Sequence, residues 1–147
     1  MRVILLVHGP NLNWLGKRDV SEYGLKTLAD IESLVTKEAL KFGYSVKAFQ
    51  SNHEGALIDF LQAESQNSVG LIINPGALTH YSYALHDALV DSAHPCVEVH
   101  LSDISTREDW RRTSVTAPAC IAQISGKKEL GYVEAVATLE RYLKGRA

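Results

Sequence analysis

The chain has 147 residues, of which 46% are hydrophobic and 22% are charged, and this composition is typical of a single globular domain. Its formal net charge of −2 argues against a basic face for nucleic acid. The longest apolar run, residues 3–7, is far too short to span a membrane, and no signal-peptide cleavage pattern follows Arg2, so we expect a soluble cytoplasmic protein.

Short apolar runs alternate with longer stretches of helical spacing along the whole chain. The apolar runs predict five strands, at residues 3–8, 45–50, 69–74, 97–101 and 120–124. The other stretches predict four helices, at residues 27–42, 54–65, 82–92 and 132–143. Thr27, with Asp30 three residues later, is a helix start signal, and Gly43 is a stop signal.

Strands that are apolar on both faces and joined by helices indicate a parallel sheet covered on both sides. We therefore predict one α/β domain over residues 1–147, a flavodoxin-like doubly wound sheet of five parallel strands. Cys96 and Cys120 lie in apolar runs, which favours reduced, buried thiols over a disulfide or a metal site. Ligands of such sheets bind beyond the carboxyl ends of the strands, so functional residues are sought there.

A loop of about eighteen residues, 9–26, follows the first predicted strand and carries Asn11, Arg18 and Tyr23. It has the spacing of neither a phosphate loop nor a dinucleotide fingerprint. Long loops in compact domains are often lids or binding loops, and arginine and tyrosine suit chemistry. The alternative is a solvated connector whose long side chains only cover the surface.

The third predicted strand ends in Asn74, Pro75 and Gly76, with His80 just beyond. A Pro-Gly turn at that place could leave backbone N–H groups pointing outward as a cradle for an anion or an oxyanion. A simple turn with a surface histidine is the competing interpretation.

Glu98 and His100 share one face of the fourth predicted strand, at its carboxyl end. A carboxylate beside an imidazole fixes the ring and favours its charged form, which suits a general acid near neutral pH. A buried structural pair is an equally consistent interpretation.

Arg107 and Arg111 follow the same strand and would share a face if their segment is helical. Because the chain has no net positive charge, a local arginine cluster indicates a small anionic ligand such as a carboxylate or phosphate. A solvated run of ion pairs with Glu108 and Asp109 is the alternative. The six histidines show no recognised metal-binding spacing, so we expect no metal and no cofactor.

The ordered motifs GPNLN, LGKR, YG, SNHEG, INPGALTH and EVHLS, followed by the arginine cluster, resemble the type II 3-dehydroquinate dehydratases over nearly the whole chain. The resemblance implies a flavodoxin-like fold and a homo-oligomer, a dodecamer built of trimers. It also implies a lyase of the shikimate pathway in aromatic amino acid biosynthesis. That enzyme dehydrates 3-dehydroquinate to 3-dehydroshikimate through an enolate, without metal or cofactor.

The catalytic roles that the resemblance implies fall on five residues of this chain. Tyr23 matches the general base, with Arg18 as the lid arginine beside it. His100 matches the general acid, and Glu98 is the neighbour that orients it. Asn11 matches the residue that stabilises the enolate through a water molecule.

The resemblance also implies how the substrate is bound. The matching positions are Asn74, His80, Leu101, Ser102 and Arg111, with Arg107 as a second lid or anion contact and Asp87 delivered from a neighbouring subunit. The chain departs from the usual pattern at His8, Leu78, His86 and Asp103, which affects expectations of affinity and trimer contacts more than of the reaction. Two other hypotheses stay open: a non-catalytic module that binds a small anion, and an assembly protein whose site residues form subunit contacts.

Overall fold

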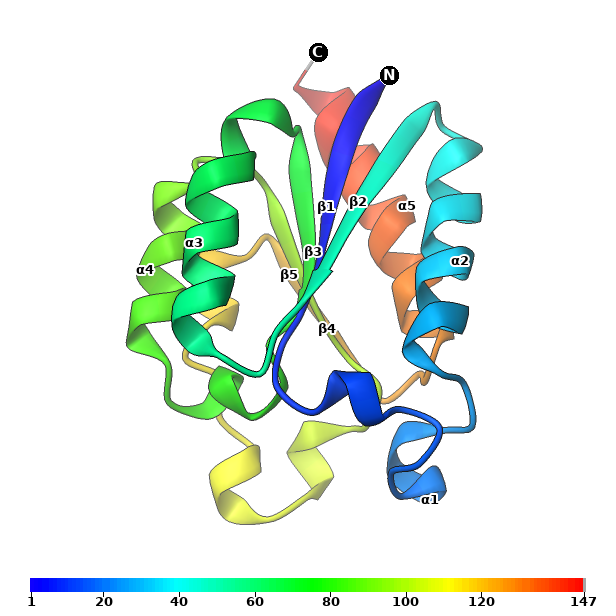
Figure 1. Ribbon diagram of the computed structural model, residues 1–147, viewed down its shortest axis with the longest axis vertical. Coiled ribbons are helices and arrows are strands. Elements are labelled where there is room, and N and C mark those ends of the chain that lie inside the picture. The colour runs from blue at the N-terminus through cyan, green and yellow to red at the C-terminus, as the bar shows by residue number, and fades with distance from the viewer. Residues whose placement is uncertain (147) are drawn as a thin grey trace.

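The computed structural model describes residues 1–146, which form one α/β domain around a five-stranded parallel sheet. The strands are β1 (Arg2–His8), β2 (Tyr44–Gln50), β3 (Gly70–Asn74), β4 (Cys96–His100) and β5 (Ala122–Ser125). Their order in the sheet is β2-β1-β3-β4-β5, and all four neighbouring pairs are parallel. The carboxyl ends of all five strands therefore lie at one edge, at the bottom of Figure 1.

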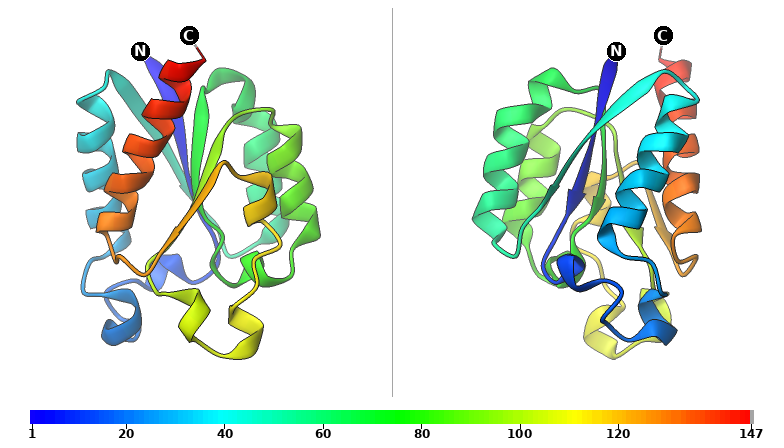
Figure 2. Two further views of the ribbon diagram at one scale, coloured as in Figure 1. Left: turned by 180° about the vertical axis from the view of Figure 1, so that it is seen from behind. Right: turned by 45° about the vertical axis from the view of Figure 1, so that its right-hand side comes forward.

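Helices cover both faces of the sheet (Figure 2). One face carries α2 (Leu28–Leu40) and α5 (Leu130–Gly145), and the other carries α3 (Glu54–Glu64) and α4 (Tyr83–Asp91). Alternate residues of each central strand point into the two apolar cores: Ile4 and Leu6 of β1 face α2 and α5, while Leu5 and Val7 face α3 and α4. The prediction of a doubly wound, flavodoxin-like sheet is confirmed.

Helix α2 begins as its sequence predicts. The Thr27 side chain accepts from the Asp30 N–H at 3.2 Å, and the Asp30 carboxylate accepts from the Thr27 N–H at 3.0 Å. This reciprocal capping box satisfies two backbone donors that a helix leaves unpaired at its start.

The loop at residues 9–26 contains a short helix that the sequence did not predict, α1 (Val20–Tyr23). The Asp19 side chain caps it by accepting from the Ser21 N–H at 2.9 Å, and Gly24, at φ 80°, ends it. We call residues 9–26 the lid loop. Because α1 is one turn long and has no buried residue, no helical periodicity marks it in the sequence.

The segment after β4 is not the continuous helix that would place Arg107 and Arg111 on one face. It forms two 3₁₀ turns, Ile104–Thr106 and Asp109–Arg111, separated by Arg107 in an extended conformation. The remaining 3₁₀ turns are Leu12–Trp14, Ser65–Asn67, Gly76–His80 and Ala117–Ala119.

Both cysteines are free thiols, as expected. Cys96 is buried, whereas Cys120 is only half-buried because it precedes the edge strand β5. Among residues 1–146, no helix is both long enough and apolar enough to cross a membrane.

Candidate active site

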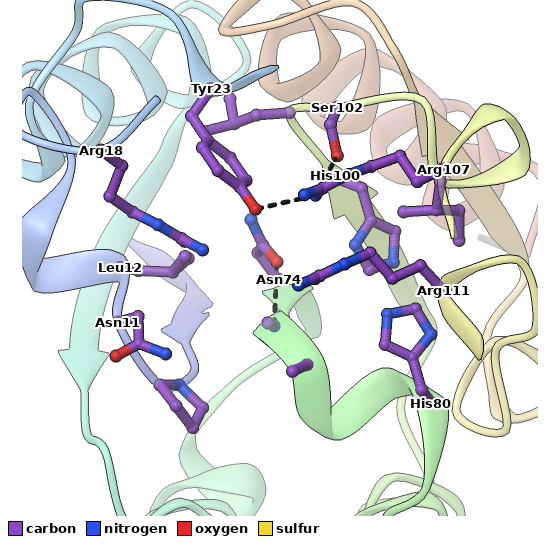
Figure 3. A pocket seen from close by; sticks show the side chains of 15 residues that line it. Asn11, Leu12, Arg18, Tyr23, Asn74, His80, His100, Ser102, Arg107 and Arg111 are labelled. Carbon is purple, nitrogen blue, oxygen red and sulfur yellow. Dashed lines mark hydrogen bonds between the residues drawn. The ribbon is translucent and has the colours of Figure 1, made fainter. Parts of the chain in front are cut away.

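A pocket lies beyond the carboxyl ends of the strands, between the lid loop and the turns that follow β3 and β4 (Figure 3). All the predicted site residues except Glu98 and Asp87 line it. They are Asn11, Arg18, Tyr23, Asn74, His80, His100, Leu101, Ser102, Arg107 and Arg111. Residues from three segments, those that follow β1, β3 and β4, thus meet where a doubly wound sheet normally binds its ligand.

Tyr23, at the end of α1, lies between two arginines (Figure 3). Its hydroxyl oxygen accepts a hydrogen bond from Nη1 of Arg107 at 2.7 Å. The Arg18 guanidinium lies over the ring, 3.8 Å from its centroid, and burial lowers the pKa of Arg18. The sequence placed Arg18 beside Tyr23, but the direct bond to the hydroxyl comes from Arg107, which is 84 residues away in the chain.

Glu98 and His100 form a buried pair at the end of β4, with Nε2 of His100 2.8 Å from Oε2 of Glu98. Three further side chains donate to the Glu98 carboxylate: Ser114 at 2.8 Å, Gln123 at 2.8 Å and Thr116. Burial alone raises the pKa of Glu98, but the bonds from His100, Thr116 and Gln123 outweigh it and lower that pKa to about 2.

The ionised Glu98 fixes which imidazole nitrogen faces the pocket. Because Nε2 of His100 is committed to the carboxylate, Nδ1 is the nitrogen left for a ligand. A neighbouring carboxylate also stabilises a protonated imidazole, so the pair is suited to donating a proton into the pocket.

The turn after β3 does not offer all its N–H groups to a ligand, which corrects the expectation of an open anion cradle. The Gly76 N–H donates to Oδ1 of Asn74 at 3.0 Å, and Nδ2 of Asn74 donates to the Tyr132 hydroxyl at 3.4 Å. Gly76 has φ 62°, and a Cβ there would lie 2.8 Å from the Pro10 carbonyl oxygen. The turn therefore packs tightly against the lid loop and holds Asn74 in place.

Asn11 reaches the pocket from a left-handed backbone conformation, at φ 71°, which asparagine tolerates better than most residues. Its N–H donates to Oδ1 of Asn52 at 2.9 Å. The Gln50 side chain donates to the Gly9 carbonyl at 3.2 Å and to Oδ1 of Asn52 at 3.2 Å. The segment after β2 thus supports the first part of the lid loop.

Cationic and polar groups gather at the opposite end of the pocket. Nε of Arg111 donates to Glu108 at 2.9 Å, and its guanidinium lies 4.0 Å from the centroid of the Trp110 ring. His80 uses Nδ1 to donate to the Thr113 carbonyl at 2.8 Å, and burial lowers the pKa of His80. The terminal nitrogens of Arg111 remain for a carboxylate, and Nε2 of a neutral His80 remains for a hydroxyl donor.

Comparison with known proteins agrees with this geometry. The family model described as Dehydroquinase class II matches residues 2–140. The chain belongs to the class II dehydroquinase family. A 3-dehydroquinate dehydratase from Roseiflexus castenholzii is 52% identical over 133 residues, covering 90% of this chain and 85% of the relative. One from Bacillus cereus strain G9842 is 48% identical over 145 residues, covering 99% of both chains.

The structural comparison identifies the same family. The crystal structure of type II dehydroquinase from Butyrivibrio crossotus has a TM-score of 0.91 and 42% sequence identity, covering 95% of this chain and 97% of that chain. The resemblance drawn from the motifs is therefore confirmed, and so is the expectation that the chain is an enzyme of the hydro-lyase class.

Asp87 lies outside the pocket of its own chain. It is on α4, and its exposed carboxylate contacts Nδ1 of His86 at 3.1 Å. Its predicted delivery to a neighbouring copy of the dehydroquinase stays a prediction.

The sequence did not identify the donors around Glu98, namely Ser114, Thr116 and Gln123, or Tyr132 behind Asn74. The hydroxyl-rich stretch at residues 113–116 is a signal that could have indicated Ser114 and Thr116, whereas no local pattern marks Gln123 or Tyr132.

The structure shows the surroundings of three of the four residues at which the chain departs from the family pattern. His8 is buried with Nε2 3.2 Å from Glu32, Leu78 is buried in the core beside α4, and Asp103 caps the turn at Ile104–Thr106. None of these three residues lines the pocket. Within residues 1–146, no three His, Cys, Asp or Glu side chains are grouped to hold a metal ion.

Proposed function

We propose that the chain dehydrates 3-dehydroquinate to 3-dehydroshikimate, with Tyr23 as the general base and His100 as the general acid. One observation carries the proposal. A single pocket holds a phenol between two guanidinium groups and an imidazole bonded to an ionised carboxylate. The curated relatives are named for this reaction, and acid-base chemistry is what these groups can perform.

Tyr23 removes a proton from the carbon next to the substrate ketone. A phenol with the reference pKa of about 10 needs roughly 4 kcal/mol of extra stabilisation to ionise near pH 7. A positive charge about 4 Å away supplies ~1 kcal/mol in water but ~4 kcal/mol at an effective dielectric of 20. Arg107 contacts the Tyr23 hydroxyl and Arg18 lies over the Tyr23 ring. Closure of the lid loop over substrate would exclude water, which otherwise weakens the attraction between these cations and the phenolate.

Tyr132 is the other tyrosine near the site, and its surroundings exclude it as the base. Burial raises the pKa of Tyr132 to about 12, and its hydroxyl is bonded to Asn74 behind the pocket. The neutral phenol instead helps to orient the Asn74 amide, so the assignment of the base to Tyr23 follows from environment as well as position.

The enolate that proton removal creates carries its charge on the former ketone oxygen. Asn11, held in its left-handed conformation by Asn52, orients a water molecule toward that oxygen. His100 then gives its proton to the hydroxyl on the next carbon, the carbon–oxygen bond breaks, and water leaves. Tyr23 ends the cycle protonated and His100 deprotonated, and exchange with solvent restores both. None of these steps uses a metal or a redox cofactor.

The substrate carboxylate binds to Arg111, and Asn74, His80, Leu101 and Ser102 bind the ring substituents.

We also propose that Asp87 completes the site of a neighbouring copy, in a dodecamer built of trimers. Light scattering tests this assembly, because twelve copies of the 16.2 kDa chain differ clearly in mass from one or three. Cell fractionation tests the cytoplasmic location, and loss of aromatic amino acid prototrophy on deletion tests a role in the shikimate pathway over quinate breakdown.

The decisive experiment adds chelator-treated protein to 3-dehydroquinate and follows the ultraviolet absorbance of the conjugated product. Rapid growth of that absorbance is expected, and Tyr23→Phe protein is the matched negative control. No growth with folded protein that still binds 3-dehydroquinate would refute the proposal in favour of an anion-binding module.

A further inference from the structure

Lys128 connects the lid loop to the opposite side of the pocket. It lies in the turn between β5 and α5, and its ammonium donates to the carbonyl oxygens of Ser21 and Glu22, both at 2.8 Å. These carbonyls belong to α1 and immediately precede Tyr23. A lysine ammonium at the carboxyl end of a helix satisfies carbonyls that have no partner within the helix.

The backbone of the same residue is bonded to the segment that carries the acid. The Lys128 N–H donates to the Leu101 carbonyl at 3.2 Å, one residue beyond His100. Nearby, the Gly126 N–H donates to the Ser102 carbonyl at 3.1 Å. Lys128 adopts φ 51°, a left-handed conformation that is uncommon for a lysine, and such backbones persist where the surrounding contacts require them.

Helix α1 has few other anchors. It is four residues long, none of them is buried, and its N-terminal cap is the local contact between Asp19 and Ser21. One turn of helix is unstable on its own, so contacts from elsewhere must hold it. Arg107 binds the Tyr23 hydroxyl and lies 3.7 Å from the Glu22 carboxylate, and Tyr23 packs against one apolar core. Within residues 1–146, however, only Lys128 joins the backbone of α1 to the residue after β4 by hydrogen bonds.

We propose that Lys128 is a positioning residue that sets the distance and orientation of Tyr23 relative to His100. It does not touch the pocket, and it acts through α1 on one side and Leu101 on the other. The inference rests on the proposed function for its kinetic consequence, but the geometry of α1 can be tested separately. Loss of the ammonium frees α1 to move, and a displacement of about 1 Å of a catalytic group can lower turnover by about 100-fold.

The chain provides a matched control in the neighbouring Lys127. Its ammonium forms a surface ion pair with Glu134, and within residues 1–146 no hydrogen bond or ion pair joins it to the lid loop. Lys127→Met therefore removes the same charge from the same turn without releasing α1. Lys128→Arg retains a cationic donor and is the conservative variant.

The experiment compares Lys128→Met, Lys128→Arg, Lys127→Met and the unsubstituted protein in three measurements. We expect Lys128→Met to lower kcat by roughly 10- to 100-fold with a smaller change in KM, Lys128→Arg to recover part of it, and Lys127→Met to leave it unchanged. Tryptic cleavage after Lys17 or Arg18 in the lid loop should accelerate only in Lys128→Met. In a Tyr23→Phe background, Lys128→Met should cause no further loss of residual activity.

Each other outcome decides against the proposal or against the function. An unchanged kcat in Lys128→Met, or a lower melting temperature with unchanged kcat, would overturn the positioning role. Equal losses in Lys127→Met and Lys128→Met would assign the effect to charge alone and would also overturn it. If the unsubstituted protein does not act on 3-dehydroquinate, the proposed function fails, and the tryptic cleavage rates alone then decide whether Lys128 holds α1.

Discussion

Substitution of Glu98 by glutamine tests whether the buried carboxylate stabilises the folded protein and orients the His100 imidazole. The carboxylate is fully buried and accepts hydrogen bonds from His100, Ser114, Thr116 and Gln123. Glutamine keeps the size of the side chain but replaces one acceptor oxygen by an NH₂ donor, which then faces other donors. Both the charge and one acceptor are lost, so stability and orientation of the imidazole should change together.

The magnitude follows from the pKa of Glu98. The folded protein lowers it from 4.5 to about 2, which corresponds to about 3 kcal/mol of stability near pH 7. Because folding lowers this pKa, the ionised carboxylate stabilises the folded protein and its protonation destabilises it. The contribution is complete above the unfolded value of 4.5, falls to about half near pH 3, and is lost as the pH drops through about 2.

Chemical denaturation followed by circular dichroism measures this directly. The difference in unfolding free energy between the unsubstituted protein and Glu98→Gln should shrink by roughly 2 kcal/mol between pH 6 and pH 3. Glu64→Gln is the control, because Glu64 pairs with Lys47 at 2.7 Å near the surface and such pairs contribute below ~1 kcal/mol. We also expect kcat of Glu98→Gln to fall by ~100-fold or more, as for other orienting carboxylates. A free-energy difference that stays constant with pH would refute the reasoning.

The remaining predictions concern the pocket itself. Tyr23→Phe and His100→Ala should each lose most turnover while their circular dichroism spectra stay those of the folded protein, and a folded, fully active variant of either would contradict the assigned mechanism. The melting temperature should stay unchanged in Tyr23→Phe and fall in His100→Ala, because the buried Glu98 carboxylate loses a hydrogen-bond partner. Arg111→Ala should raise KM roughly 10- to 100-fold with a smaller effect on kcat, and an unchanged KM would count against a carboxylate clamp. Asp87→Ala should be inactive alone, yet recover activity when unfolded and refolded together with Tyr23→Phe chains; no recovery would place Asp87 outside the neighbour's site.

Local signals predicted the fold well, because a parallel sheet repeats simple patterns. Apolar runs of five or six residues marked the strands, and the Thr27 and Asp30 capping signal located the start of α2 to within one residue. Helix α1 escaped prediction because a single turn cannot show a 3.6-residue period. The segment around Arg107 was ambiguous for the same reason, and Arg107 itself is extended.

The site was predictable wherever its residues follow a strand directly. Asn74 and His100 stand at strand ends, so topology alone brings them to one edge of the sheet. The contacts that tune these groups were not predictable, because they join distant residues without a local pattern. Arg107 and Tyr23 are 84 residues apart, and Gln123 and Glu98 are 25 apart. Such pairs become neighbours only through tertiary packing.

The proposed acid, His100, lies on a central strand of the sheet, whereas the proposed base, Tyr23, lies on a loop. His100 is 5% exposed on β4, which pairs with strands on both sides. Tyr23 instead lies on a single helix turn with no buried residue, which is held by hydrogen bonds from Arg107 and Lys128 and by packing of Tyr23 against one apolar core. A carboxylate–imidazole pair needs fixed donors and low dielectric, which a central strand supplies. A phenol that must ionise needs nearby cations and, at the moment of reaction, the exclusion of water, which a loop that closes over substrate can supply. Substitutions around Glu98 should therefore lower stability and turnover together, whereas substitutions that loosen the lid loop should lower turnover with little change in stability.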